Sequence, residues 1–99
     1  MVFEKLKLTG KTILITGAGT GLGREMALAL SNAGANLVIA ARREKLINEV
    51  CEMIKQRGNR AIAIPADLTD SKQVENLVQS GLDQFKSIDV LINNAGIVR

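Results

Sequence analysis

Short apolar runs alternate along the chain with longer segments in which apolar and polar residues recur at helical spacing. The runs are rich in Ile, Leu and Val and are bounded by turn residues, so they predict buried β-strands. They occupy residues 12–16, 36–41, 61–64 and 89–93. Pro65 follows the third run directly, at a strand end where a missing N–H is tolerated.

The segments between the runs predict three helices, over residues 22–33, 43–57 and 70–85. Gly34 and Gly58 follow the first two, where a glycine commonly ends a helix. Asp70 and Gln73 have the spacing of a capping box and predict the start of the third helix. The single cysteine, Cys51, lies on the apolar side of the second helix and is interpreted as a core residue.

This order, β-α-β-α-β-α-β, predicts one α/β domain segment over residues 1–99. Apolar runs on all four strands predict burial on both faces, which is typical of parallel sheets with right-handed helical crossovers. We therefore predict a Rossmann-like, doubly wound parallel sheet with strand order 3-2-1-4. The segment is the first half of such a fold, so the fourth strand is expected to form an open edge.

Composition excludes several classes of function. The chain has no His, Tyr or Trp, so it offers no imidazole cluster for a metal and little aromatic surface for nucleic acid. No apolar stretch approaches the roughly 18 residues of a membrane span. The N-terminus has no apolar signal segment, and one cysteine cannot form an internal disulfide. We expect a cytoplasmic protein with no metal, membrane or nucleic-acid partner.

Charge is unevenly distributed. Residues 1–60 carry ten Lys and Arg against five Asp and Glu, whereas residues 61–99 carry three against five. The basic half would attract phosphate groups. Solvated helix surfaces would produce the same asymmetry, so charge alone does not decide between these interpretations.

A glycine-rich loop joins the first predicted strand to the first helix. Residues 16–23 read Thr-Gly-Ala-Gly-Thr-Gly-Leu-Gly and hold four of the nine glycines. Such a loop lets the backbone approach a diphosphate while the helix N-terminus supplies N–H donors. The spacing G-x-G-x-x-G fails in every frame, and no Gly-Lys-Ser/Thr follows. The pattern that fits is T-G-x-x-x-G-x-G; the alternative is a glycine-rich turn without a ligand.

Together with two further motifs, this loop resembles the short-chain dehydrogenase/reductase family in its classical branch. The other motifs are Asp67-Leu68 after the third strand and Asn93-Asn94-Ala95-Gly96 at the end of the fourth. All three follow strand ends in the expected order, and the resemblance covers essentially the whole chain. One departure is Lys86, where relatives usually have a glycine; a lysine adopts the left-handed conformation of a helix end at some cost in energy.

The resemblance implies a dinucleotide site. Glycine-loop residues would line the diphosphate, and Gly23 would pack the first helix on the first strand. Asp67 and Leu68 would flank the adenine. The motif that begins at Asn93 would contact the adenosine ribose and form the floor of the site. The implied cofactor-binding residues are Gly17, Thr20, Gly21, Leu22, Gly23, Arg42, Asp67, Leu68, Asn93, Ala95 and Gly96. Alternatively, Asp67 caps a turn, and Asn93 and Asn94 tie strand ends together.

Residues after the second strand favour NADP over NAD as the cofactor. An NAD site usually carries a carboxylate at that strand end, but here Ala41 is followed by Arg42 and Arg43. A guanidinium binds a 2′-phosphate with paired donors, and Arg42 is the expected contact. The alternatives are two exposed arginines in a first helical turn, and Glu44 as a weak argument for NAD.

No catalytic residue is assigned. In the family a Tyr, with a Lys, a Ser and an Asn, supports hydride transfer, and all four lie beyond the fourth-strand motif. We therefore expect the cofactor-binding part of an NADP-dependent oxidoreductase acting on a carbonyl or alcohol, homo-oligomeric at full length, and inactive as 99 residues alone. The alternative is a complete, non-catalytic nucleotide-binding or interaction module.

Overall fold

The computed structural model describes residues 7–94, and its centre is a parallel sheet. The strands are β1 (Thr12–Thr16), β2 (Asn36–Ala41), β3 (Ala61–Pro65) and β4 (Val90–Asn93). They pair in the order β3-β2-β1-β4, and every pairing is parallel. The predicted topology is confirmed, and each strand boundary lies within one residue of the prediction.

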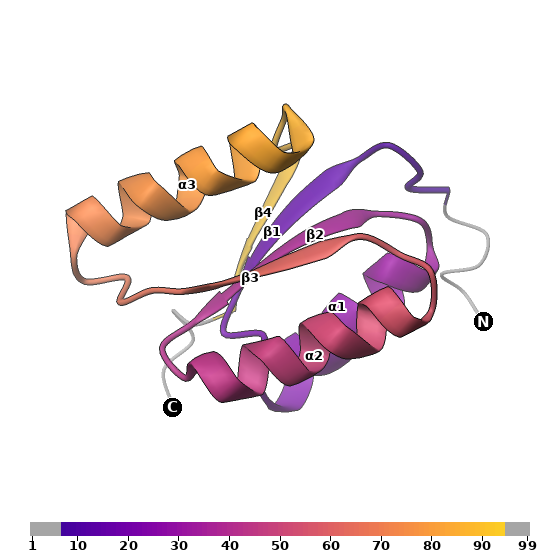
Figure 1. Ribbon diagram of the computed structural model, residues 1–99, viewed down its shortest axis with the longest axis horizontal. Coiled ribbons are helices and arrows are strands. Elements are labelled where there is room, and N and C mark those ends of the chain that lie inside the picture. The colour runs from indigo at the N-terminus through magenta and orange to yellow at the C-terminus, as the bar shows by residue number, and fades with distance from the viewer. Residues whose placement is uncertain (1–6, 95–99) are drawn as a thin grey trace.

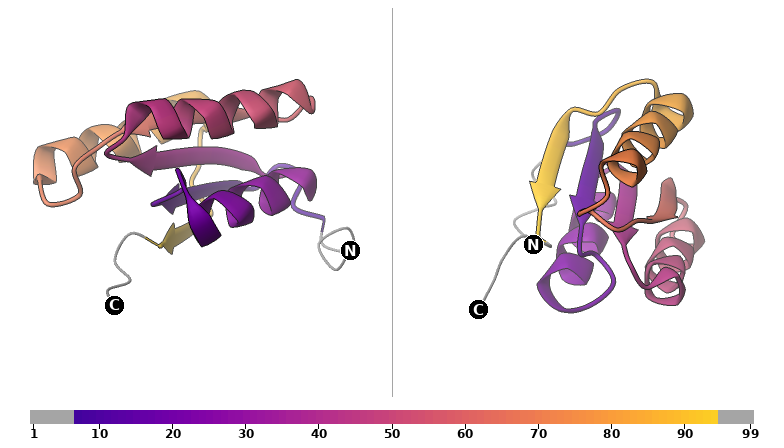
Figure 2. Two further views of the ribbon diagram at one scale, coloured as in Figure 1. Left: turned by 90° about the horizontal axis from the view of Figure 1, so that it is seen from below. Right: turned by 90° about the vertical axis from the view of Figure 1, so that its left-hand side faces the viewer.

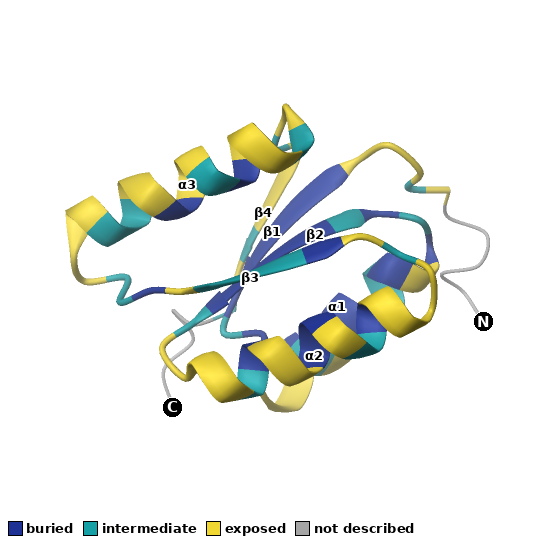
Figure 3. Cartoon of the chain, in the orientation of Figure 1, coloured by how far each residue is buried: buried dark blue, intermediate teal, exposed yellow. Residues whose placement is uncertain are grey.

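Three helices cover the two faces of this sheet (Figure 1). They are α1 (Gly21–Asn32), α2 (Glu44–Gln56) and α3 (Ser71–Phe85). Alternate residues of the central strands face opposite helices: Ile15 and Ile39 pack with α1 and α2, whereas Leu14 and Val38 pack with α3. The sheet centre is therefore buried on both sides, as the dark strands of Figure 3 show. Cys51 lies in the same core, and burial raises the pKa of its thiol.

The fourth strand departs from the predicted burial. Val90 and Leu91 are 43% and 63% exposed. Within residues 7–94, β4 pairs only with β1 and lies at one edge of the sheet (Figure 2). Helix α3 packs over β2 rather than over β4, so it leaves Val90 and Leu91 exposed. The prediction of burial on both faces is wrong for this strand, whereas the open edge is observed.

Helix ends follow the predicted signals. Gly34 and Gly58 have φ values of 102° and 84°, which an L-side chain rarely adopts. Asp70 caps the start of α3, and its Oδ1 accepts from the N–H groups of Lys72 and Gln73. The Gln73 side chain departs from the usual capping box because its Oε1 accepts from the Asp67 N–H. The third helix is thereby tied to the end of β3.

Lys86 ends α3 in the left-handed conformation, with φ 74°. Lys86→Gly is expected to raise the free energy of unfolding by about 0.5–1 kcal/mol. Glycine removes a left-handed strain of about 1–2 kcal/mol, which its greater freedom in the unfolded chain partly offsets. Urea unfolding measures the change. The control, Lys55→Gly in the last turn of α2, should lower the free energy of unfolding. If Lys86→Gly also lowered it, left-handed strain at Lys86 would not be the explanation.

Candidate functional site

The glycine-rich loop lies at the carboxyl end of β1 and leads directly into α1. Gly17 and Gly21 have φ values of 70° and 55°, so the loop depends on glycine to turn. The Gly17 N–H donates to the Ala40 carbonyl oxygen at 2.8 Å, which anchors the loop to the end of β2. Thr20, the residue before α1, makes no side-chain capping bond, and the first turn of α1 has no acidic residue. The positive end of the helix is therefore open to an anion.

Gly23 holds α1 close to this loop. A Cβ at Gly23 would collide with the Gly17 carbonyl oxygen and lie 2.7 Å from Asn94 Nδ2. Asn94 Nδ2 itself donates to the Gly17 carbonyl oxygen at 3.2 Å. Thr16 Oγ1 donates to Asn93 Oδ1 at 2.9 Å. Both asparagines thus join the end of β4 to the glycine loop, as the structural alternative for these residues predicted.

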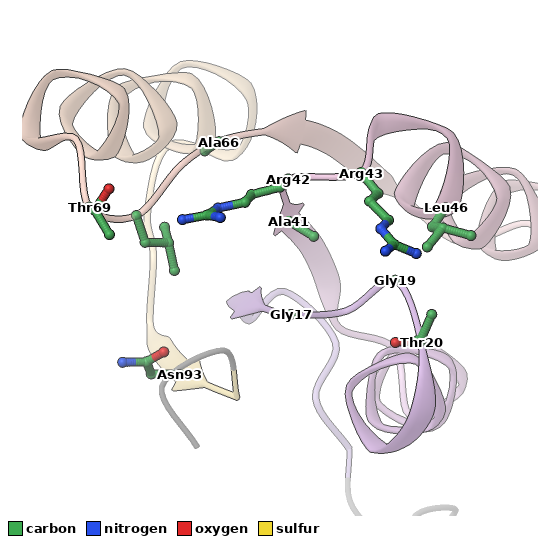
Figure 4. Close-up of a pocket in the computed structure, with 11 residues that line it drawn as sticks. Gly17, Gly19, Thr20, Ala41, Arg42, Arg43, Leu46, Ala66, Thr69 and Asn93 are labelled. Atoms are coloured by element: carbon green, nitrogen blue, oxygen red, sulfur yellow. The ribbon is translucent and has the colours of Figure 1, made fainter. Parts of the chain in front are cut away.

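A cavity of about 620 Å³ opens at the carboxyl ends of the strands (Figure 4). It is bounded by the glycine loop, the end of β2, the first turn of α2, the loop after β3 and the end of β4. Its lining residues are Gly17, Gly19, Thr20, Ala41, Arg42, Arg43, Leu46, Ala66, Leu68, Thr69 and Asn93. Ligands of open α/β sheets bind at this end, next to the point where strand order reverses.

The structure brings five of the predicted cofactor-binding residues to this cavity: Gly17, Thr20, Arg42, Leu68 and Asn93. Gly21, Leu22 and Gly23 lie in the first turn of α1, outside the lining, and Leu22 is 64% exposed. Asp67 is in contact with the lining residue Arg42. Ala95 and Gly96 lie outside the described residues.

Sequence reasoning favoured Arg42 over Arg43 as the contact and did not assign Leu46 to the site, but Arg43 and Leu46 both line the cavity. Figure 4 shows the Arg43 side chain pointing toward Gly19 and Thr20 from the start of α2. A Cβ at Gly19 would lie only 3.0 Å from Leu46 Cβ, so the loop and α2 approach closely. The available signal was topological: the helix after the second strand begins at the same sheet edge as the glycine loop.

Arg42 extends from the end of β2 toward the loop after β3, where it pairs with Asp67. The Arg42 Nη2 to Asp67 Oδ1 distance is 3.2 Å. The same oxygen accepts from the Thr69 N–H at 2.9 Å and from Thr69 Oγ1 at 2.7 Å. These Thr69 bonds, with the charge of Arg42, hold the pKa of the Asp67 carboxyl below its ordinary value. The ionised Asp67 carboxylate therefore stabilises the folded protein at pH values above the pKa that Asp67 has in the unfolded chain. This contribution to the free energy of unfolding is lost as the pH falls through the lower pKa of Asp67 in the folded protein.

A second hollow, of about 660 Å³, lies between α1 and α2. Three of its lining residues are carboxylates, Glu44, Glu49 and Glu52, against the cations Arg24 and Lys45. Carboxylates would repel a diphosphate, whereas the first cavity carries Arg42 and Arg43 and, apart from the neighbouring Asp67, no carboxylate among the described lining residues. The first cavity is therefore the candidate site for an anionic ligand.

Within residues 7–94, no helix is long and apolar enough to cross a membrane. No group of His, Cys, Asp and Glu in the same part of the chain has the arrangement of a metal site. The chemistry of the candidate site thus rests on backbone N–H groups, two guanidinium groups and short polar side chains.

Comparison with known proteins adds independent information. The family model described as short chain dehydrogenase matches residues 11–99. The chain is 47% identical over 90 residues to the ketoacyl reductase HetN of Nostoc sp. (strain PCC 7120), covering 91% of this chain and 31% of that protein. It is 36% identical over 93 residues to the 7alpha-hydroxysteroid dehydrogenase of Escherichia coli K12, covering 94% of this chain and 36% of the enzyme.

Solved structures agree with the sequence matches. A short-chain type dehydrogenase/reductase from Mycobacterium marinum aligns with a TM-score of 0.89 at 37% identity, over 100% of this chain and 40% of that one. A hydroxysteroid dehydrogenase from Escherichia coli aligns with a TM-score of 0.86 at 34% identity, over 89% of this chain and 37% of that one. The chain spans a little over a third of the length of these structures. By its sequence, strand order and glycine loop, the chain belongs to the short-chain dehydrogenase/reductase family.

Proposed function

We propose that this chain forms the dinucleotide-binding part of an NADP-dependent oxidoreductase that transfers a hydride between a nicotinamide and a carbonyl or alcohol. The observation that carries the proposal is the pair of guanidinium groups, Arg42 and Arg43, on the same cavity as the glycine loop. When bound, the nicotinamide cofactor would supply the hydride chemistry. The described residues would bind and orient the cofactor.

The donors around the cavity fit a dinucleotide with phosphates at two places. Backbone N–H groups at the start of α1, next to Thr20, would donate hydrogen bonds to the diphosphate oxygens. Leu68 and Ala66, which lie on the opposite side, offer an apolar surface for an adenine. Asn93, at the end of β4, would meet the ribose, and Gly23 would keep α1 close to the loop. Ala95 and Gly96 are proposed by the family motif alone.

The preference for NADP rests on the end of β2. Ala41 offers no carboxylate for a ribose 2′-OH, and the next two residues are cationic. Glu44, the residue that argued for NAD, lines the hollow between α1 and α2 and not the candidate cavity. A 2′-phosphate could therefore contact Arg42 and Arg43 without electrostatic repulsion from Glu44.

Binding tests this proposal directly. Calorimetric titration of the full-length protein should give tighter binding of NADP⁺ than of NAD⁺. The advantage should shrink as salt rises, because an exposed charge-assisted contact is screened. Equal affinities at low salt would contradict the NADP preference, and binding of neither cofactor would contradict the proposed function.

The 99 residues alone are expected to show no carbonyl reduction. The chain contains no Tyr or His to serve as the proton donor, and such general acid–base help is worth about 10²–10⁴-fold. Reduced nicotinamide absorbance, followed over hours with a panel of ketones, measures turnover. Turnover above a heat-treated control would require a Lys or Asp acid. A non-catalytic nucleotide-binding module stays the alternative if the full-length protein binds NADP⁺ without turning over any substrate.

The whole protein's substrate, assembly and location belong to the same proposal. A small carbonyl or alcohol is expected because relatives are named as reductases and dehydrogenases. A homo-oligomer is expected from the family resemblance, and a cytoplasmic location from the single cysteine, Cys51.

A further inference from the structure

Arg42, which lines the candidate cavity, is already paired with a carboxylate. Its Nη2 lies 3.2 Å from Asp67 Oδ1, so a carboxylate from the loop after β3 already contacts the guanidinium that lines the cavity. Any phosphate that approaches Arg42 would share it with Asp67 and would be repelled by the Asp67 charge. The Arg42–Asp67 ion pair therefore influences which anions bind in the cavity.

The Asp67 carboxylate is held by more contacts than the Arg42 guanidinium. Asp67 Oδ1 accepts two hydrogen bonds from Thr69, and the Asp67 N–H donates to Gln73 Oε1 at 2.8 Å. Gln73 Nε2 in turn donates to Asp70 Oδ2 at 3.2 Å, at the start of α3. The Arg42 side chain is 71% exposed, against 39% for Asp67. A ligand would thus move the arginine and leave the carboxylate where it is.

We infer that Asp67 is a specificity-determining counter-charge: it restrains Arg42 in the free protein and weakens binding of cofactors that carry a 2′-phosphate relative to those that do not. This inference rests on the proposed function of the cavity. Asp67 acts through Arg42 and is therefore a positioning residue. A contact of Asp67 with adenine alone would affect both cofactors equally, because both carry the same adenine.

The experiment compares the ratio of the NAD⁺ and NADP⁺ dissociation constants in the full-length protein and its Asp67→Asn variant at low salt. The asparagine keeps an oxygen for Thr69 but removes the charge. The ratio is expected to rise about two- to fivefold, the range for loss of an exposed ion pair. At 0.5 M NaCl the difference should largely disappear.

Matched variants separate this role from a structural one. Asp67→Glu keeps the charge and should keep the wild-type ratio. Asp83→Asn makes the same carboxylate-to-amide change in the far part of α3 and should leave the ratio unchanged. In an Arg42→Gln background, Asp67→Asn should not alter the ratio. If Asp67→Asn fails to fold, Asp67→Ser serves as a second neutral variant with the same expected rise.

Two results would overturn the inference while leaving the proposed function intact, provided that the wild-type protein binds NADP⁺. One is an unchanged ratio in Asp67→Asn, which includes an equal loss of affinity for both cofactors, and the other is a ratio that falls. A wild-type protein that binds neither cofactor would overturn the proposed function itself, and this inference with it.

Discussion

Gly23→Ala is expected to destabilise the protein by about 2–3 kcal/mol and to weaken NADP⁺ binding at least about tenfold. The new Cβ would collide with the Gly17 carbonyl oxygen, which is backbone and cannot rotate away. Relief requires α1 to move from the glycine loop, and the N–H groups that face the cavity would move with it. Urea unfolding and calorimetric titration measure the two effects.

Glu25→Ala is the matched control for this substitution. Glu25 is exposed in the same turn of α1, so its replacement should change stability by no more than about 0.5 kcal/mol and leave cofactor affinity unaltered. If Gly23→Ala were as stable as the control and bound NADP⁺ normally, the close packing of α1 on the loop would not be required for the site.

Arg42→Asp is expected to weaken NADP⁺ binding about 10- to 100-fold and to spare or improve NAD⁺ binding. A charge-assisted contact is worth about 1.5–3 kcal/mol, and the new carboxylate could accept from a ribose 2′-OH. It would also stand beside Asp67, which adds repulsion toward a 2′-phosphate. Titration with each cofactor gives the two dissociation constants.

The control for Arg42→Asp is Arg57→Asp. Arg57 follows the other end of α2 and contacts Asn32, so the same change of charge occurs far from the cavity. This variant should leave the ratio of the two dissociation constants near its wild-type value. An equal loss of both cofactors in Arg42→Asp would mean that Arg42 supports the structure and does not select the cofactor.

Most of the fold could be predicted because local signals agree with tertiary packing. The β-branched runs of β1 and β2 are buried on both faces, and Gly34 and Gly58 end helices where the sequence places them. Position 89 shows the limit of such reasoning. The Asp89 side chain accepts from the Thr12 N–H, so regular pairing of β4 begins one residue later, at Val90.

The exposure of β4 could not be predicted from its apolar residues. An apolar run indicates that a strand is suited to burial, but the number of its neighbours is a property of the whole sheet. Leu91 shows the difference: it is typical of a core residue by type and is 63% exposed at the edge of the described sheet.

The candidate site was predictable where backbone chemistry defines it and not where side chains from distant elements meet. The glycine loop and the end of β4 carry recognisable motifs. Arg42 and Asp67 are 25 positions apart, and their contact depends on side-chain conformations that no spacing rule encodes. Arg43 was ranked below Arg42 because the sequence does not show which of two adjacent arginines faces the glycine loop.

A crystal structure of the full-length protein with NADP⁺ would show directly whether the cavity at the glycine loop binds this cofactor. We expect the diphosphate against residues 17–21 at the start of α1, and the 2′-phosphate within hydrogen-bond distance of the Arg42 guanidinium. A cofactor seated between α1 and α2, or one whose 2′-phosphate contacts neither Arg42 nor Arg43, would contradict the account.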